Sequence, residues 1–396
     1  MAIDAENAGS APRRIRLGMV GGGQGAFIGG VHRMAARIDD SYELVAGALS
    51  SDAARATASA AELHIAAERS YVDYRDMARK ESAREDGIDV VAIVTPNHLH
   101  GRIASAFLDA GIDVICDKPL TTTLAEALEL VLRVRKSGRL FALTHNYSGY
   151  PMVRQAREMA AAGELGEIRV VHAEYPQDWL STDLESTGQK QAAWRVDPAQ
   201  AGAGGSLGDI GTHAEHLARF ISGLELAAVS ADLTTFVAGR RLDDNAHMML
   251  RYTNGARGML WSSQVAPGNE NALRVRIYGS KAGLEFRQEN PNHLWFTPLG
   301  QQPRLITRGG PGNGAAAAQA TRIPAGHPEG YLEGFAQIYR DVAEQIQARW
   351  QGRAPNPLAC TVPTVEDGAR GMKFIEAAVE SSRADGRWTD ARLTNL

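Results

Sequence analysis

Residues 15–32 read IRLGMVGGGQGAFIGGVH, and this stretch decides the fold. Its first six residues, Ile15–Val20, are mostly apolar and predict a buried strand. A glycine-rich loop follows the strand directly, and a helical pattern follows the loop. This order is typical of a dinucleotide-binding unit, because glycines let the backbone approach a pyrophosphate and the helix N-terminus offers free N–H donors.

The glycine spacing fits a dinucleotide fingerprint in two registers. In one register, Gly21, Gly23 and Ala26 satisfy G-x-G-x-x-A without a gap. In the other, Gly21 and Gly23 make the turn, three extra residues follow, and Gly29 packs the helix against the strand. A plain glycine-rich turn without a ligand is the remaining interpretation. The loop residues expected to contact the cofactor are Gly21, Gly23, Gln24, Gly25, Ala26, Phe27 and Ile28.

Short apolar runs alternate with longer helical patterns up to about Tyr147. Such runs predict strands buried on both faces of a parallel sheet, and the alternation predicts an α/β, doubly wound Rossmann domain over residues 13–148. In the helical stretch Leu124–Lys136, Thr123 and Glu126 supply a capping-box signal. The expected strands are Ile15–Val20, Leu44–Leu49, Val90–Val94, Val114–Cys116 and Phe141–Thr144.

The pattern changes after about Tyr150, and residues 149–396 predict an α+β domain for substrate binding and oligomerisation. Turn signals such as Asn254-Gly255 separate consecutive strands, which favours an open, mostly antiparallel sheet. Its expected strands are Ile168–Tyr175, Met248–Tyr252, Gly258–Ser263, Leu273–Tyr278 and Gly283–Arg287. The other expected segments are a flexible N-terminus (1–12), helix Arg154–Ala162, a loop without periodicity (Arg308–Gly330), and helices Tyr331–Trp350 and Val365–Ser382. The last helix is a candidate to pack back on the Rossmann domain.

Composition and charge exclude several classes of protein. The 396 residues are 44% hydrophobic and 22% charged, and the net charge of −4 argues against a nucleic-acid binder. Two cysteines exclude a disulfide framework and fit a reducing compartment. The sequence has neither a signal-peptide pattern nor a run of about 18 apolar residues, so we expect a cytoplasmic protein without a membrane partner. One face of an open sheet must be covered, so we expect a homodimer or homotetramer formed through it.

The end of the second strand bears on the choice between NAD and NADP. Ser50 and Ser51 stand where an acid would bind the adenosine ribose hydroxyls of NAD. Asp52 is better interpreted as the N-cap of the next helix. Arg55 is near enough in sequence to contact a 2′-phosphate, whereas serine also hydrogen-bonds an unphosphorylated ribose. We therefore expect NAD(P) as cofactor, held in part by Ser50, Ser51 and Arg55, with the choice between the two forms open.

Polar residues also follow the ends of the third and fourth predicted strands. Ligands bind beyond the carboxyl ends of parallel strands, so these residues are expected to reach the ribose and the nicotinamide. For His100, an exposed position at a helix start is an equally open alternative. Together with Asn146, the expected ligands here are Thr95, Pro96, Asn97, His100, Asp117 and Lys118.

Three side chains are candidates for the chemistry. Lys118 lies at a strand end where its ammonium would stabilise a developing alkoxide; a solvated surface lysine is the alternative. Asp209 and His213 are spaced i, i+4, so on a helix the carboxylate would fix the imidazole tautomer for proton transfer. The alternative is an acid that complements the helix dipole beside an unrelated histidine. A zinc site of Asp209, His213, His216 and His172 lacks convincing spacing, and we expect no metal.

The ordered set of motifs resembles the Gfo/Idh/MocA family, the glucose-fructose oxidoreductase and inositol dehydrogenase group. The resemblance covers about residues 13–385. It rests on the Gly21–His32 loop, Thr95-Pro96-Asn97-x-x-His100, Asp117-Lys118-Pro119, Gly202-x-Gly204-Gly205 with Asp209-x-x-x-His213, and Glu366-Asp367-Gly368. It implies a Rossmann domain, a C-terminal open-sheet domain, NAD(P) at their interface and sugar or cyclitol substrates. It also implies that Lys118, Asp209 and His213 form the catalytic trio.

The sequence departs from the family pattern at three places. The loop has three extra residues when Gly29-x-x-His32 is aligned with the usual Gly-x-x-His. Asp117 replaces the usual glutamate before the lysine, and His216 replaces the usual acid three residues after the histidine. These departures bear on substrate and cofactor preference more than on reaction class.

We therefore expect reversible oxidation of a secondary ring hydroxyl of a sugar, anhydrosugar or cyclitol, with nicotinamide as hydride acceptor. His213 would accept the proton, Asp209 would orient it, and Lys118 would stabilise the oxygen. The alternatives are a lyase or glycosidase-type enzyme that recycles a tightly bound NAD, and a non-catalytic NAD(P) sensor. The expected substrate contacts are Lys118, Asn146, Tyr147, Trp194, Arg195, Asp209 and His213, with Glu174, Gln177 and Asp178 as further candidates.

Overall fold

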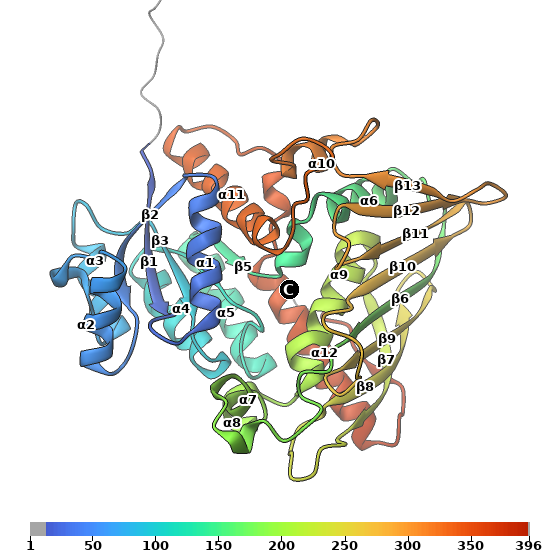
Figure 1. The fold of residues 1–396 in the computed structure, drawn as a ribbon, viewed down its shortest axis with the longest axis horizontal. Helices are drawn as coiled ribbons and strands as arrows, with labels where there is room; N and C mark the ends of the chain where they lie inside the picture. Colours follow the sequence, from blue (N-terminus) through green and yellow to red (C-terminus); the bar gives the residue numbers. More distant parts are fainter. Residues whose placement is uncertain (1–12, 395–396) are drawn as a thin grey trace, which may run out of the picture.

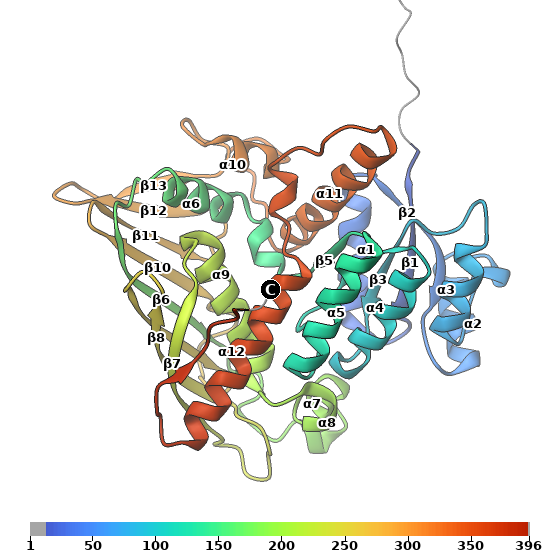
Figure 2. The same cartoon turned by 180° about the vertical axis from the view of Figure 1, so that it is seen from behind.

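The structure, a computed structural model, describes residues 13–394, and within this range the strands form two sheets with helices between and around them (Figure 1). The predicted flexible N-terminus, residues 1–12, lies outside the described residues. The first sheet and its helices form one side of the molecule, and the second sheet forms the other (Figures 1 and 2). This division is the α/β and α+β arrangement that the sequence predicts.

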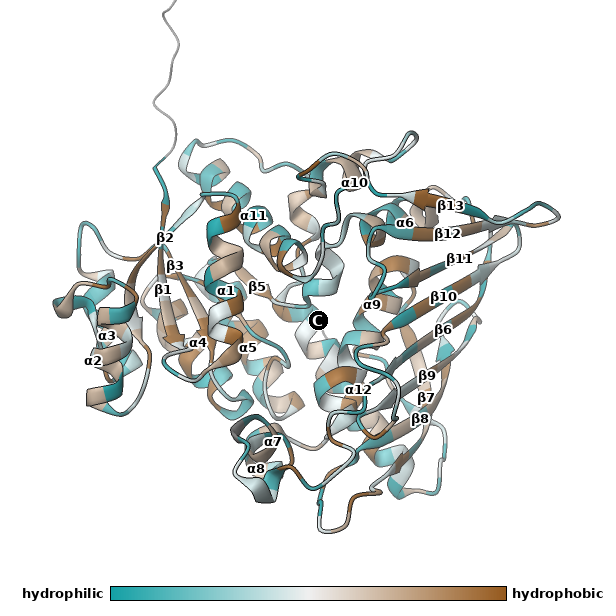
Figure 3. Ribbon diagram, in the orientation of Figure 1, coloured by the Kyte–Doolittle hydropathy of each residue, from teal (hydrophilic) through white to brown (hydrophobic). Residues whose placement is uncertain are grey.

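The first sheet is parallel throughout, with strand order β2-β1-β3-β4-β5. Its strands are β1 (Ile15–Gly21), β2 (Tyr42–Ala48), β3 (Val90–Val94), β4 (Asp113–Cys116) and β5 (Phe141–Leu143). The predicted strands are confirmed to within two residues at each end. The central strand β3, with the sequence VVAIV, is buried along its whole length because helices cover both faces of the sheet. Figure 3 shows the strands in this region as largely hydrophobic.

Helices from both halves of the chain cover the first sheet. Those from the first half are α1 (Phe27–Ile38), α2 (Ala53–Glu62), α3 (Tyr74–Ser82), α4 (His100–Asp109) and α5 (Leu124–Ser137). The predicted N-caps are confirmed, since Thr123 accepts a hydrogen bond from the Glu126 amide and Asp52 accepts one from the Arg55 amide. The reciprocal half of the predicted capping box does not form, because the Glu126 carboxylate accepts from the hydroxyls of Thr122 and Thr123 instead. Helix α11 (Tyr331–Trp350) packs on α1, and α12 (Val365–Arg383) packs on α5 and β5 (Figure 2). These two helices from the second half of the chain therefore pack directly on elements of the first half.

The second sheet has strand order β13-β12-β11-β10-β6-β9-β8-β7-β14 and is antiparallel except where β6 pairs with β9. Its strands are β6 (Ile168–Pro176), β7 (Leu226–Thr234), β8 (Asn245–Tyr252), β9 (Arg257–Ser263), β10 (Arg274–Gly279), β11 (Ala282–Arg287), β12 (His293–Pro298), β13 (Arg304–Thr307) and β14 (Thr389–Asp390). Burial alternates along β8, as expected when one face is covered and the other is open. Helices α6 (Pro151–Ala161), α9 (Thr212–Ser222) and α12 cover the inner face.

The structure corrects two predictions of local structure. Residues 308–330 are not a loop throughout, because the alanine-rich run Ala315–Ala320 forms helix α10, which packs on α6. Alanine has the highest helix propensity, so this short helix forms without an amphipathic pattern. Helix α6 begins at Pro151, three residues before the predicted start, because proline suits the first turn of a helix. Strands β7, β12, β13 and β14 are not predicted by the patterns above.

No helix in residues 13–394 combines the length and the apolar character that a membrane span requires.

Candidate active site

A cavity of about 860 Å³ lies between the glycine loop and the inner face of the second sheet. Its size suits a ligand that is largely enclosed by protein. Most predicted site residues line it, and they come from both halves of the chain. They are Gly21, Gly23, Gln24, Ala26, Phe27, Ile28, Ser50, Ser51, Arg55, Thr95, Pro96, Asn97, Asp117, Lys118, Asn146, Tyr147, Trp194, Arg195, Asp209 and His213. Gly25 and His100 do not line the cavity, so their predicted contacts with the cofactor are not supported.

The glycine loop adopts the longer of the two predicted registers. Gly21 and Gly22 have positive φ angles of 81° and 72°, a conformation that favours glycine. A Cβ atom on Gly29 would lie 2.4 Å from the Gly22 Cα atom, so Gly29 is the glycine at which helix α1 packs against the loop. Ala26 is the N-cap of α1 and offers no side-chain cap to the first helical amides. These amides are therefore available to a pyrophosphate.

The close approach of Gly29 predicts a large difference between two neighbouring substitutions. Gly29→Ala should lower the free energy of unfolding by about 2 kcal/mol and weaken NADH binding, because a methyl group would push α1 away from the loop. Gly30→Ala is the matched control: its Cβ atom would have only the far end of Arg33 near it, at 4.0 Å. It should leave binding intact and add up to about 1 kcal/mol of stability. Thermal unfolding and NADH fluorescence titration of both variants test this, and equal behaviour would contradict it.

The end of β2 presents hydroxyl groups and one cation to the cavity. Ser50, Ser51 and Arg55 line this end, and Arg55 is exposed. Asp52 is engaged in capping α2 through a 2.8 Å hydrogen bond from the Arg55 amide, as predicted. Among the lining residues in the described part of the chain, Asp117 and Asp209 are the acids; Asp117 follows β4, and Asp209 lies in the turn Leu207–Gly211 of the second half. At this end of the cavity, the described lining residues therefore include no carboxylate that would repel a 2′-phosphate.

His100 has a structural position rather than a place in the cavity wall. Its side chain is fully buried, and its two ring nitrogens each lie 2.8 Å from a main-chain carbonyl oxygen, those of Thr95 and Pro119. The ring thus ties the loop after β3 to the loop after β4, which carries Lys118. Both predicted alternatives, a cofactor ligand and an exposed helix start, are wrong. The reason is that the loop after β4 folds over the first turn of α4 and encloses the ring.

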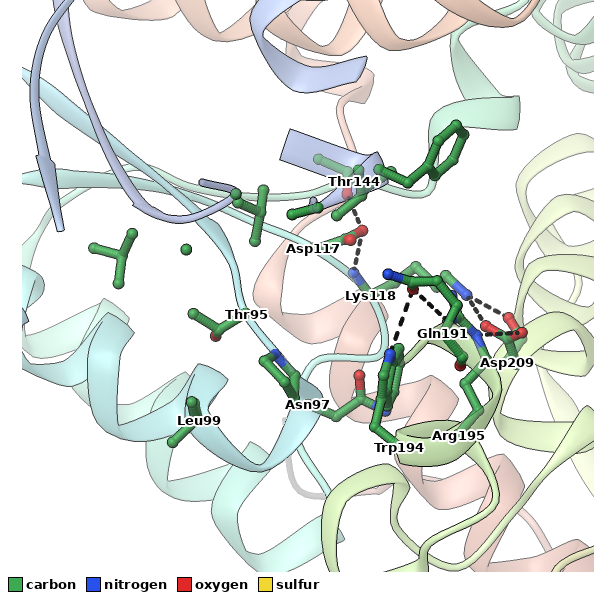
Figure 4. A pocket seen from close by; sticks show the side chains of 18 of the residues that line it. Thr95, Asn97, Leu99, Asp117, Lys118, Thr144, Gln191, Trp194, Arg195 and Asp209 are labelled. Carbon is green, nitrogen blue, oxygen red and sulfur yellow. Dashed lines mark hydrogen bonds and ion pairs between the residues drawn. The ribbon is translucent and has the colours of Figure 1, made fainter. Parts of the chain in front are cut away.

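Lys118 is held at the meeting point of the two halves of the chain (Figure 4). Its Nζ atom donates to the Asp209 carboxylate at 2.9 Å and also to the Asp209 main-chain carbonyl, and its side chain is 14% exposed. Asp117 stays on the other side of the loop, where it accepts hydrogen bonds from the Lys118 amide and from Thr144 Oγ1, each at 2.9 Å. A solvated surface lysine is therefore excluded. Two of the three ammonium protons are used, which leaves one for a ligand.

Asp209 pairs with two cations at once. Its second carboxylate oxygen accepts from Arg195 Nε at 3.0 Å and from Gln264 Nε2 at 2.9 Å. Burial by itself raises the pKa of Asp209, but Arg195 and Lys118 outweigh burial and hold the pKa of this carboxyl below its usual value. Asp209 is therefore an anion at neutral pH and compensates the charges beside it.

The predicted hydrogen bond from the His213 ring to the Asp209 carboxylate is not formed in the described structure. Leu207–Gly211 is a π-helical turn that precedes α9, so residues four apart are not stacked as they would be on an α-helix. Both Asp209 oxygens are taken by other donors, and the Nδ1 atom of His213 is buried without a partner. Burial and then Lys118 lower the pKa of His213 well below its usual value. His213 is therefore a neutral imidazole in the cavity wall.

Asp243 holds the turn that carries Asp209. Its carboxylate accepts from the Gly205 amide at 2.7 Å and from the Leu207 amide at 2.8 Å. A Cβ atom on Gly205 would lie 2.1 Å from the Asp243 carbonyl oxygen, so the two segments are in close contact. This contact explains the glycine at position 205.

Polar and aromatic side chains from the second half complete the cavity. Tyr175 Oη and Gln177 Nε2 both donate to Asn271 Oδ1 at 2.7 Å, which makes a network beside Tyr147. The Arg195 guanidinium lies over the rings of Trp194 and Trp179, 4.3 Å and 5.7 Å from their centroids. Trp194 lines the cavity and is partly exposed, so it is not a core residue. Lining residues without a sequence prediction include Tyr175, Trp179, Gln191, Asn271, Tyr331 and Phe335.

Other sequence candidates lie elsewhere. His172 and Glu174 alternate with buried residues of β6 and belong to its outer face, where His172 contacts Tyr278 and Glu174 contacts Arg274. Asp178 accepts a hydrogen bond from the Gly268 amide and does not line the cavity. Across the described part of the chain, no three His, Cys, Asp or Glu side chains are grouped so that they could hold a metal ion.

The cavity fits a dinucleotide. The glycine cradle is too narrow for a side chain at Gly22 or Gly23, where a Cβ atom would approach other atoms to 2.8 Å or 2.7 Å. Thr95 Oγ1 and Asn146 Nδ2 line the cavity and are buried without hydrogen-bond partners. Buried polar groups normally have partners, so these two atoms indicate ligand contacts.

Comparisons with known proteins agree with this geometry. A model of the oxidoreductase family with an NAD-binding Rossmann fold matches residues 15–145, and a model of the GFO/IDH/MocA C-terminal domain matches residues 153–285. The crystal structure of an oxidoreductase from Sinorhizobium meliloti is 54% identical, with a TM-score of 0.87 over 95% of this chain and 99% of its own.

Two further proteins are similar and have named ligands or activities. An inositol dehydrogenase homologue from Azotobacter vinelandii, crystallised with NADH and myo-inositol, is 37% identical, with a TM-score of 0.88 over 96% of this chain and 98% of its own. Levoglucosan dehydrogenase from Pseudarthrobacter phenanthrenivorans is 30% identical over 71% of this chain and 76% of its own length. With both halves matched in order and relatives of this identity covering nearly its whole length, the chain belongs to the Gfo/Idh/MocA family of NAD-binding oxidoreductases.

Proposed function

We propose that this oxidoreductase transfers hydride between a secondary ring hydroxyl of a sugar, anhydrosugar or cyclitol and nicotinamide. The observation that carries the proposal is the meeting of Lys118 and His213 in one cavity, beside the dinucleotide cradle. Myo-inositol in the Azotobacter structure and the activity named for the levoglucosan enzyme support this substrate class.

The charges in the cavity favour a neutral substrate. The two cations Lys118 and Arg195 are matched in the cavity lining by the two carboxylates of Asp209 and Asp117, so no excess positive charge there favours an acid group. The side-chain amides of Gln177 and Asn271 suit ring hydroxyls, because each amide offers both donors and an acceptor. The faces of Trp179 and Trp194 suit the C–H face of a ring.

Each of these residues has a separate role in the proposed alcohol oxidation. The third N–H of Lys118 donates to the substrate oxygen and stabilises negative charge on it. The neutral imidazole of His213 accepts the hydroxyl proton. The glycine loop, Thr95 and Asn146 hold NAD(P), which supplies the hydride acceptor when bound. Asp209 keeps the ammonium in place and compensates its charge.

A panel of neutral sugars, anhydrosugars and cyclitols, read by absorbance of reduced nicotinamide, tests the proposal. Turnover with at least one ring polyol and none with matched sugar acids is the expected result. The alternative of an internally recycled NAD predicts substrate conversion without net NADH, so product analysis on the same samples separates the two. Absence of any conversion across the panel would contradict both.

Arg55 is proposed to accept the 2′-phosphate of NADP without excluding NAD. Arg55→Ala should weaken NADP⁺ binding by about tenfold and leave NAD⁺ binding within about twofold, because a charge-assisted hydrogen bond is lost only with the phosphorylated form. Titration of both cofactors against both proteins gives the comparison. A strong preference of the unaltered protein for NAD⁺ would remove this role of Arg55.

We also propose a homodimer or homotetramer that forms through the outer face of the second sheet. Large apolar side chains are exposed on this face, including Met249, Met259 and Trp295 at 54%, 55% and 42%. Monomers seldom expose such a surface, and a second copy would cover it. Light scattering of dilute protein should give a multiple of the protomer mass of 42.5 kDa, and Met249→Asp with Met259→Asp should shift it towards the protomer. A single 42.5 kDa species before substitution would contradict the proposal.

The cytoplasm is the proposed location. Within residues 13–394, Cys116 is buried and Cys360 is exposed, and neither forms a disulfide. Unpaired cysteines of this kind fit a reducing compartment.

A further inference from the structure

Three histidines form a buried cluster behind the cavity wall. His145 follows β5, and His213 and His216 lie one turn apart on α9. The rings of His145 and His216 are stacked, with centroids 4.1 Å apart and planes 6° from parallel. The ring of His145 meets His213 edge to face, at 5.4 Å and 82°. Only His213 of the three lines the cavity, and all three are at most 7% exposed.

No hydrogen bond in the described structure fixes the ring of His213 from behind. The Nδ1 atoms of His213 and His145 are both buried without partners. Two aromatic rings lie closest to the His213 ring. The centroid of Tyr147 is 4.8 Å from it, and that of His145 is 5.4 Å from it. Aromatic packing therefore takes the place of the carboxylate or carbonyl that commonly holds a catalytic histidine.

The charged groups around the cluster lie on opposite sides of it. On the cavity side, Lys118, Asp209, Tyr147 and Tyr175 surround His213. On the far side, His216 faces Arg219 of α9, Arg157 of α6 and Asp367 of α12, and Arg219 pairs with Asp367 at 2.7 Å. Burial lowers the pKa of His216 to about 3 and that of His145 well below its usual value. The stacked pair is thus an uncharged layer between two charged regions.

We propose that His145 and His216 are positioning residues, whose uncharged stack holds the ring of His213 and keeps it unprotonated. The inference rests on the proposed function, in which His213 accepts the substrate proton. It gives a physical reason for an uncharged ring at position 216. A carboxylate at this position would lie one helical turn from His213 and would favour the protonated form of the His213 ring. A second positive charge beside Lys118 would oppose binding of an oxidised, cationic nicotinamide.

The proposal predicts a titration that differs from that of an ordinary histidine. In the whole protein with NADH bound, the His213 ring should show no titration between about pH 5.5 and 8, where a free imidazole has its midpoint near 6.5. Histidine-labelled NMR measures this directly, with the His213 signal assigned by its loss in His213→Asn. A midpoint near 6.5 would overturn the proposal.

Two variants at one position separate charge from packing. His216→Asp should move the His213 midpoint up by about one pH unit or more, into the measured range. His216→Phe keeps a stacked ring without a titratable group, so its His213 signal should behave as in the unaltered protein. If both variants give the same titration, the stack does not act through charge and the proposal is wrong. If the aspartate variant does not fold, the unaltered protein and His216→Phe still test the proposal, because a His213 midpoint near 6.5 in either would overturn it.

The NMR readout also separates this inference from the proposed function. If a substrate is found, the acid limb of kcat/KM for oxidation should follow the NMR midpoint in each variant. If no substrate is turned over but His213 stays unprotonated and responds to His216→Asp, the proposed function fails and the positioning role stands. If substrates are turned over but the titrations do not differ, the positioning role fails alone.

Discussion

Replacing Lys118 with alanine is expected to lower kcat about a thousandfold while NADH still binds. In the proposed reaction the Lys118 ammonium donates to the developing alkoxide, and loss of one such donor typically costs a factor of 10²–10³, with further loss if proton transfer is disturbed. The fold should survive, because Asp209 keeps its contacts with Arg195 and Gln264. Steady-state kinetics and NADH fluorescence titration give the two readouts.

Lys136→Ala is the matched control for this experiment. Lys136 is an exposed lysine in the last turn of α5, away from the cavity lining, so its loss should change neither kcat nor NADH affinity. Turnover of Lys118→Ala near that of the unaltered protein would end the assignment of Lys118 to the chemistry.

Asp209→Asn is expected to impair both stability and activity. The amide would leave Lys118 and Arg195 without their shared anion in a site where each side chain is less than a quarter exposed. Breaking a buried ion pair on one side costs about 3 kcal/mol or more, and the displaced ammonium should lower kcat by about a hundredfold. Urea unfolding and steady-state kinetics measure the two effects.

The same substitution should change how stability depends on pH. The pKa of Asp209 is depressed in the folded protein, so its carboxylate stabilises the fold above about pH 4, the usual value for an unfolded aspartate. This contribution is lost as pH falls below that value, and Asp209→Asn should remove it. Asp390→Asn is the control, because Asp390 and Arg392 form an exposed pair worth less than about 1 kcal/mol. Equal losses of stability at pH 7 in the two variants would contradict the buried-pair argument.

Much of the fold follows from local patterns. The strand β3 and the helix α11 have the predicted bounds, Val90–Val94 and Tyr331–Trp350. A continuous apolar run predicts a buried strand, and a long helical pattern predicts a helix with one buried face. Neither prediction requires knowing which segment packs against the element. The Thr123 and Asp52 caps are equally local, since each hydrogen bond spans three residues.

The site residues follow from the sequence only in part. Lys118, Asp209 and His213 stand out because each lies in a dense motif at a predicted strand or helix end. Tyr175 closes a predicted strand and Gln191 lies one helical turn before Trp194, so weak local signals exist for them. Asn271 has no such signal, because it lies in a loop and reaches Tyr175 across 96 positions of sequence.

The two wrong predictions in the site, for His100 and for the Asp209–His213 hydrogen bond, have a common physical cause. His100 and the Asp209–His213 spacing each suggest a role from their sequence neighbours, yet the bonds they make are set by segments packed on them from elsewhere. The loop after β4 encloses His100, and Lys118, 91 positions before Asp209, takes the carboxylate that the spacing assigns to His213.

Strand and helix types, their order and the glycine cradle are thus encoded in residues close together along the chain, where periodicity, caps and backbone freedom act. The glycine-loop register is decided when α1 packs on the loop, through the contact between Gly22 and Gly29. The charge balance around Lys118 and the uncharged histidine stack behind His213 arise only when the two halves of the chain pack together. Hydrogen-bond partners and the loss of water depend on which distant groups share a buried space, and that is a property of packing rather than of sequence neighbours.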